Sequence, residues 1–265
     1  MCALSAAPWP RRLAAALALA AALGGCTLLN PREHHGTASV VDFLYADSTV
    51  AATPPRTPVL RLPLRVGIAF VPCRTVASAS LTQARQSEML QRMANHFKRY
   101  NIVKTIDVIP SDYLQPRGGF GNLDQIKILY GVDVIALVSY DQVQFTDEGA
   151  LSLTYWTIVG AYVVPGERND TQTLLDTVVM DIASHKMLFR APGSDHITGR
   201  ASLVNASEQL RADSVASFDA AGQRMIDNLD LELARFREKV KQNPADYQVE
   251  RPSGTGAGAG GGSLE

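Results

Sequence analysis

Residues 132–143 read VDVIALVSYDQV, the most apolar strand-like stretch of the chain. A nearly continuous apolar run is typical of a central strand that helices cover on both faces. The residues before it alternate between strand-like runs and helix-like spacing of apolar side chains. The predicted elements there are a strand at 65–71, a helix at 82–100, a strand at 102–109 and a short helix near 123–130. This β-α-β-α-β order predicts a largely parallel sheet with helices packed against it.

The pattern changes after the central strand. Residues 151–164 and 173–182 are strand-like runs rich in Val, Thr and Tyr. A tight turn at Ser184-His185-Lys186 leads into 187–190, so these strands are expected to pair as antiparallel hairpins. Residues 202–242 predict a long final helix. The predicted fold class is therefore α/β with α+β character in the second half, in which a mixed sheet carries a long C-terminal helix.

The start of the chain has the parts of an export signal. Arg11 and Arg12 precede a run of Ala and Leu at 13–23, which is too short to span a bilayer. The tetrapeptide Leu23-Gly24-Gly25-Cys26 resembles the lipobox that bacterial lipoprotein signal peptidase recognises. This resemblance implies cleavage before Cys26 and attachment of diacylglycerol and acyl chains, such as palmitate, to its sulfur. Thr27 follows instead of Asp, which by the lipoprotein sorting rules indicates the outer membrane.

Composition divides the chain into four segments. We expect a signal peptide at 1–25, a lipidated tether rich in Pro, Ser and Thr at 26–63, a single α/β domain at 64–244, and a disordered Gly-rich tail at 245–265. Within the tether, residues 39–45 are too apolar for a pure linker. They are expected to dock on the domain or on a partner.

The charge balance argues against two kinds of contact, with nucleic acid and with anionic membranes through a basic patch. Without Arg11 and Arg12 the chain has 23 basic against 26 acidic residues, a balance that argues against nucleic-acid binding. It also provides no polybasic membrane patch, so the expected contact with the membrane is the lipid on Cys26. Cys73 is the remaining cysteine of the mature chain, and we expect it to be buried.

Motifs for catalysis are absent from the sequence. It contains no phosphate-binding loop, nucleophile elbow or zinc motif, and its histidines lack partners at metal-binding spacing. The sequence therefore predicts no enzyme, no metal and no cofactor beyond the acyl chains. Four carboxylates lie around the central strand: Asp133, Asp141, Asp147 and Glu148. Turn formation is the favoured interpretation for them, and a ligand site at the strand ends is the alternative.

Aromatic residues suggest an interaction surface. Tyr155 and Trp156 would lie on opposite faces of a regular strand, so one of them is expected to be exposed or covered by a partner. Packing under the final helix is the alternative. With Phe43 and Tyr45 of the tether, they form the candidate interaction surface.

Two family resemblances cover the domain. The order of elements over residues 64–240 looks like the α/β domain shared by curli-secretion pore lipoproteins and the amino-terminal domain of the Tol translocation protein. Residues 130–137 (YGVDVIAL) resemble their central strand, and 179–189 (VMDIASHKMLF) resemble their hairpin. The lipobox, residues 39–45 (SVVDFLY) and the terminal Gly261-Gly262-Ser263-Leu264 resemble the rhombotarget lipoproteins, the proposed targets of the protease rhombosortase. Rhombosortase signals continue into a hydrophobic helix and a basic end, whereas this sequence stops at Glu265, so association with rhombosortase is not expected.

The leading hypothesis from the sequence is a lipid-anchored, non-catalytic interaction domain of the envelope, acting in surface-protein export or assembly. Its expected partners are the membrane, through the lipid, and an envelope protein or a second copy. The first alternative is an oligomeric secretion channel, against which Asp176 and Asp181 count because they fall on opposite faces of one strand. The second is a hydrolase using Asp133 and Asp141.

Overall fold

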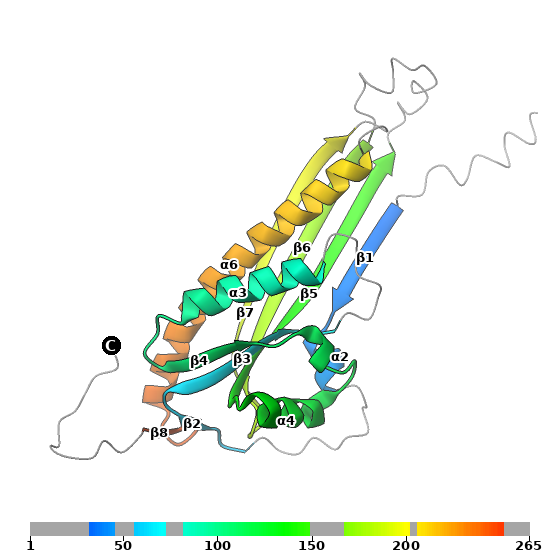
Figure 1. The fold of residues 1–265 in the computed structure, drawn as a ribbon. Helices are drawn as coiled ribbons and strands as arrows, with labels where there is room; N and C mark the ends of the chain where they lie inside the picture. The colour runs from blue at the N-terminus through cyan, green and yellow to red at the C-terminus, as the bar shows by residue number, and fades with distance from the viewer. Residues whose placement is uncertain (1–31, 46–55, 73–81, 149–166, 202–205, 252–265) are drawn as a thin grey trace, which may run out of the picture.

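The computed structural model describes residues 32–45, 56–72, 82–148, 167–201 and 206–251 (Figure 1). The elements are β1 (Arg32–Ala38), α2 (Val40–Leu44), β2 (Val59–Arg61), β3 (Leu64–Phe70), α3 (Gln83–Phe97), β4 (Val103–Val108), a 3₁₀ turn (Ser111–Tyr113), α4 (Gly119–Tyr130), β5 (Val134–Glu148), β6 (Glu167–Asp181), β7 (Lys186–Ala201), α6 (Ala206–Gln242) and β8 (Gln248–Glu250).

A mixed sheet forms the centre of the fold. Its strand order is β4-β3-β5-β6-β7, in which β3 runs parallel to β4 and β5, while β5, β6 and β7 run antiparallel. β3 pairs with the first part of β5 and β1 pairs antiparallel with the rest of it, so both lie along the same side of β5. The predicted fold class is confirmed, and so are the β-α-β-α-β start, the hairpin and the long C-terminal helix.

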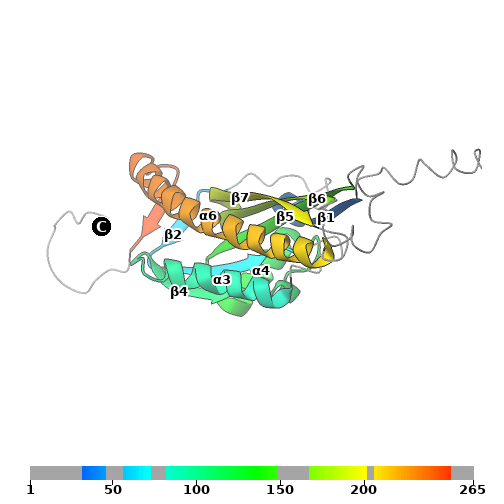
Figure 2. The same cartoon turned by 90° about the horizontal axis from the view of Figure 1, so that it is seen from above.

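Helices cover both faces of β5, as its apolar sequence predicts. Val134, Ala136 and Val138 face a core with α3 and α6, and the alternate residues Ile135 and Leu137 face a second core with α2 and α4. The alternation follows from the two-residue period of a strand. α3 and α6 lie side by side on the first face (Figures 1 and 2).

The N-terminal half of α6 packs on polar residues of the sheet. Gln142 donates from Nε2 to Thr173 Oγ1 (2.7 Å) and to the carbonyl oxygen of Ser214 (3.1 Å) on α6. Gln144 donates in the same way to the carbonyl oxygen of Leu210 (3.1 Å). Because these buried amides have partners, polar residues are tolerated under the helix here. The apolar packing is concentrated at the other end of α6.

Part of the expected tether and tail belongs to the folded body. β1 adds a strand to the sheet, and α2 buries Val40 and Phe43. β2 pairs in parallel with β8, so residues 248–250 are ordered by a segment almost 200 positions earlier in the chain. The structure therefore differs here from the segments expected at 26–63 and 245–265. Backbone pairing between distant segments has no local sequence signal.

β7 is much longer than the expected run of 187–190. Residues 191–200 read APGSDHITGR, in which proline and glycine are typical of loops. They nevertheless pair with β6 up to the ends of both strands. The final helix is continuous over its described length, and the strand expected at 151–164 lies outside the described residues. Within the described ranges, no helix combines the length and apolarity needed to cross a bilayer.

Candidate functional site

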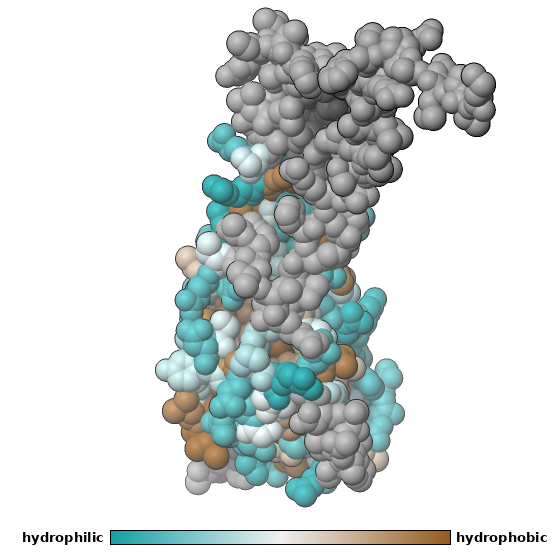
Figure 3. Space-filling view, turned by 90° about the vertical axis from the view of Figure 1, so that its right-hand side faces the viewer, coloured by the Kyte–Doolittle hydropathy of each residue, from teal (hydrophilic) through white to brown (hydrophobic). Residues whose placement is uncertain are grey.

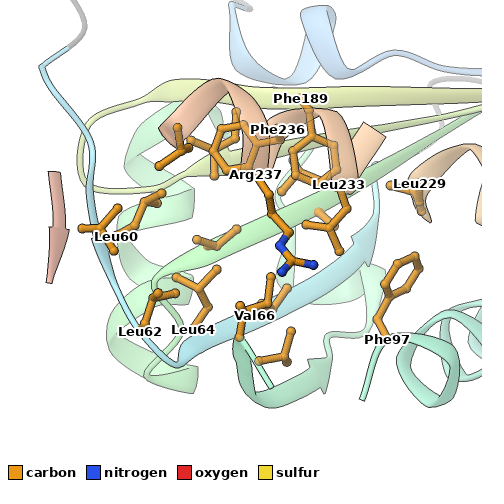
Figure 4. Close-up of a pocket in the computed structure, with 18 of the residues that line it drawn as sticks. Leu60, Leu62, Leu64, Val66, Phe97, Phe189, Leu229, Leu233, Phe236 and Arg237 are labelled. Carbon is orange, nitrogen blue, oxygen red and sulfur yellow. The ribbon is translucent and has the colours of Figure 1, made fainter. Parts of the chain in front are cut away.

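A cavity of about 400 Å³ lies between the C-terminal half of α6 and the β3–β4 end of the sheet (Figure 4). Aliphatic and aromatic side chains from both sides make up most of its walls. The principal ones are Val66, Ile106, Leu188, Leu229, Leu233 and Phe236. Apolar cavities of this size, with a few polar groups, are typical of small-ligand sites.

The walls follow from the periods of the two elements that form them. On β3, Leu64, Val66 and Ile68 alternate with residues of the opposite face, so all three point toward α6. On α6, Leu229, Leu233 and Phe236 recur at four- and three-residue spacing and present one stripe. An apolar stripe of this kind ordinarily packs in the core of a protein. The structure shows that part of it borders a cavity instead.

The β2–β8 pair closes one end of the cavity. Leu60 of β2 is buried and lines the cavity with Val249 of β8. The N–H of Leu62 donates to the carbonyl oxygen of Glu250 (2.8 Å), and Arg61 Nε donates to the Glu250 carboxylate (2.9 Å). These bonds tie the segment before β3 to the residues that follow α6.

Three aromatic rings pack against one another at this end of the cavity. Phe236 meets Phe189 and Tyr247, each with ring centroids 5.4 Å apart. Tyr247 is buried, and the ammonium group of Lys186 lies 4.6 Å from its ring centroid. Such aromatic and cation–π contacts add to the apolar burial. The wall at Phe236 is therefore held in place by aromatic packing.

Among the described residues that line the cavity, the charged ones are all cationic: Arg237, Lys241 and Arg251. Figure 4 shows the Arg237 guanidinium reaching between Leu233 and Val66. Its Nε atom is buried. Lys241 Nζ lies 2.8 Å from Glu238 Oε1 on the exposed side of α6. The described lining thus combines apolar walls with positive charge and contains no carboxylate.

A polar cluster joins α3 to α6 beside the cavity residues Phe97 and Leu229. Asp230 Oδ2 lies 2.7 Å from His96 Nε2 and accepts from Arg99 (3.0 Å), while Oδ1 accepts from the Tyr100 hydroxyl (2.8 Å). Burial raises the pKa of Asp230, but the hydrogen bonds from His96 and Tyr100 and the charges of His96 and Arg99 outweigh it, and the pKa lies below its ordinary value. Because its bonds connect two helices, the cluster is a clamp that holds the cavity walls together.

The candidate interaction residues have different positions in the structure. Phe43 is only 3% exposed and packs in the core under α4, whereas Tyr45 is 56% exposed and meets Phe120 edge-on at 5.4 Å. Leu23, Gly24, Gly25, Cys26, Cys73, Tyr155 and Trp156 lie outside the described residues. On the face shown in Figure 3, the coloured residues are mostly hydrophilic, and hydrophobic ones occur in small groups.

The carboxylates of the central strand do not come together. Asp133 forms a two-point ion pair with Arg65 (2.8 and 2.9 Å). Asp141 lies eight residues further along the same extended chain, about 26 Å away at 3.3 Å per residue. The side chains of Asp147 and Glu148 are not among those described. Asp133 and Asp141 therefore do not form the paired carboxylates that a hydrolase would need.

The two acids that counted against a channel have protein partners. Asp176 accepts from Arg190 on the neighbouring strand (2.7 and 2.8 Å). Asp181 is buried, and its Oδ2 accepts the N–H of Ser184 (2.8 Å), so it shapes the β6–β7 turn. Among the described residues, no group of three or more His, Cys, Asp or Glu could hold a metal ion.

Sequence reasoning missed the cavity. Its one local signal is that Arg237 lies between Leu233 and Val240 of the apolar stripe of α6, and that Lys241 follows directly after Val240. The other walls come from α3 and from strands β2 to β8, and the meeting of these elements is a property of the tertiary fold.

No protein-family model matches the chain, and no curated protein sequence matches it. Among solved structures, it is similar to a dodecamer of a PelC point variant from Paraburkholderia phytofirmans, with a TM-score of 0.28 and 10% sequence identity. The alignment covers 71% of this chain and 97% of that chain. A likeness at this level carries no inference about function.

Proposed function

We propose that this chain is a lipid-anchored, non-catalytic lipoprotein of the outer membrane whose domain binds the alkyl chain of a lipid-like ligand. The observation that carries the proposal is the cavity of about 400 Å³ with aliphatic walls. The lipobox ending at Cys26 supports the anchor, and Thr27 after it supports the location. In this proposal the domain's interaction partner in the envelope is a molecule derived from the membrane.

The cavity walls favour a flexible chain over a polar substrate. Val66, Ile106 and Leu188 offer no hydrogen-bonding group to orient a sugar or a peptide. Burying a methylene group contributes about 0.8 kcal/mol, so affinity should rise about fourfold for each added methylene until the cavity is full. This dependence on chain length is the signature of the proposed function.

A non-catalytic role is supported by the polar groups beside the cavity. Asp230 and His96 bind each other and two further side chains of the same clamp. Asp133 is held by Arg65. These groups act in structural contacts.

The test is displacement of the neutral dye N-phenyl-1-naphthylamine from the full chain by 1-octanol, 1-decanol, 1-dodecanol and 1-tetradecanol. Dye fluorescence should rise on binding, and each longer alcohol should displace the dye at lower concentration, with a plateau. Neutral alcohols isolate the contribution of the alkyl chain.

Two variants locate the binding site. Val66→Trp and Leu233→Trp fill the cavity from its two opposite walls and should abolish dye binding. Leu174→Trp, a matched strand substitution at a residue 40% exposed and outside the cavity, should leave it intact. Thermal melts verify that each variant is folded. Undiminished dye binding in both folded cavity variants, or no dye binding in the wild type, would refute the proposed function.

A further inference from the structure

We propose that the ligand is a long-chain carboxylate, whose single alkyl chain occupies the cavity and whose anionic head is bound by Arg237, Lys241 and Arg251. This inference rests on the proposed function and adds the chemical class of the ligand. The juxtaposition that carries it is a set of three cationic residues on an apolar cavity, whose described lining holds no acidic residue.

Arg237 is the central group of this set. Its guanidinium lies among aliphatic side chains of the cavity, between Leu233 on its own helix and Val66 on β3 (Figure 4). A guanidinium offers a planar fork of donors that binds a carboxylate in a two-point geometry. Charge-assisted hydrogen bonds are stronger where water is scarce, as at the buried Nε of Arg237.

Lys241 lies one helical turn beyond Arg237, and Arg251 follows β8 at the same end of the cavity. Two acids near the cavity engage cations at the surface: Glu238 pairs with Lys241, and Glu250 pairs with Arg61. Both acids are more than half exposed, and exposed ion pairs of this kind are weak and exchange readily. An anionic head can therefore draw Lys241 toward the cavity.

The volume favours one chain over two. At about 400 Å³ the cavity is near the lower end of the range of about 300–1,000 Å³ for small-ligand sites. A diacyl phospholipid would have to place two chains in this space. A single-chain carboxylate satisfies both the volume and the charge of the lining.

The experiment compares ligands with the same chain and different heads. The full chain with Cys26→Ser is used, because that substitution removes the protein's own acylation site. Displacement of N-phenyl-1-naphthylamine is measured for dodecanoate, 1-dodecanol and dodecyl phosphate at pH 7.5, where the carboxylate is ionised. Dodecanoate should bind at least tenfold more tightly than 1-dodecanol, and at least as tightly as dodecyl phosphate.

Charge-removal variants test the three cations. Arg237→Gln should reduce the preference for dodecanoate over 1-dodecanol to below threefold. The double variant Lys241→Gln/Arg251→Gln should reduce it as well, and it serves as the test if Arg237→Gln does not fold. Lys127→Gln, on α4 across the sheet, is the matched control and should keep the full preference.

The outcomes separate the two proposals. Equal affinity for dodecanoate and 1-dodecanol would overturn the carboxylate inference and leave the alkyl-chain function standing. A more than tenfold preference for dodecyl phosphate over dodecanoate would also overturn it. Displacement by none of the three would refute the proposed function itself.

Discussion

Replacing Gly193 by alanine should destabilise the protein strongly, because α6 lies directly on β7 at this point. A Cβ at Gly193 would lie 2.7 Å from Met225 Cβ, and closer still to the carbonyl oxygen of Ala221 and the N–H of Met225. Real Cβ contacts essentially never fall below 3.0 Å. The obstruction is helix backbone, which cannot rotate away as a side chain can.

The magnitude follows from the displacement required. The contact with Met225 Cβ alone requires α6 to move about 0.7 Å, from 2.7 Å to an ordinary distance of about 3.4 Å, and the nearer backbone atoms require a larger movement. The buried residues Phe218 and Met225 would move with it. Overpacking of a core costs about 1–3 kcal/mol, and backbone contact places this case at about 3 kcal/mol. For a domain of this size the melting temperature should fall by about 6–12 °C.

The assay is thermal and urea unfolding followed by far-ultraviolet circular dichroism. Gly121→Ala is the matched control, since no atom lies within 4 Å of a Cβ there, and alanine in α4 should be neutral or stabilising by up to about 1 kcal/mol. Because α6 forms one wall of the cavity, Gly193→Ala should also weaken alkanol binding. A melting temperature of Gly193→Ala within 2 °C of wild type would show that α6 does not approach β7 as described.

Three further predictions concern the clamp, the loop before α4 and the anchor. Asp230→Asn should cost about 1–3 kcal/mol in urea unfolding, because it removes a carboxylate bonded to His96 and its neighbours. Since the pKa of Asp230 is lowered in the folded state, its contribution to the free energy of unfolding is present above about pH 4 and is lost as the pH falls through the folded-state pKa. A stability advantage of wild type over Asp230→Asn that persists undiminished at pH 2 would contradict this. Asn122→Ala should cost about 1–3 kcal/mol, since the buried Oδ1 accepts the N–H of Gln115 (2.8 Å); a chemical-denaturation midpoint equal to wild type would exclude that role. Cys26→Ser should abolish labelling with palmitate and release the protein from membranes on fractionation, and continued labelling would place the lipid elsewhere.

Much of the fold was predictable because its main elements have strong local periods. The apolar run at 132–143 indicated a strand covered on both faces, and the structure confirms it with two cores on alternate residues of β5. The helix expected at 82–100 is α3, where Thr82 caps the first turn by accepting the N–H of Arg85. The turn at Ser184-His185-Lys186 was predictable as well, because a short run of polar residues between two strand-like runs favours a hairpin.

The candidate site was less predictable, because its parts are far apart in the chain. The sequence located Cys26 from a short contiguous motif, which remains a prediction. It did not indicate that Leu60, Val66 and Leu233 border one cavity. It also placed Tyr45 and Phe43 in one candidate surface, although Phe43 of α2 is buried and Tyr45, just after α2, is exposed.

The sequence by itself therefore determined the fold class, the identity of the long elements and the expectation of a lipid anchor, since each depends on neighbouring residues. Only the tertiary structure decided that β1 extends the sheet, that the loop-like residues 191–200 form a strand, and that β2 and β8 close a cavity. The physical reason is that hydrogen bonds between strands and the volume left between packed side chains depend on residues brought together from across the chain. The convergence of Arg237, Lys241 and Arg251 on apolar walls likewise depends on the tertiary structure.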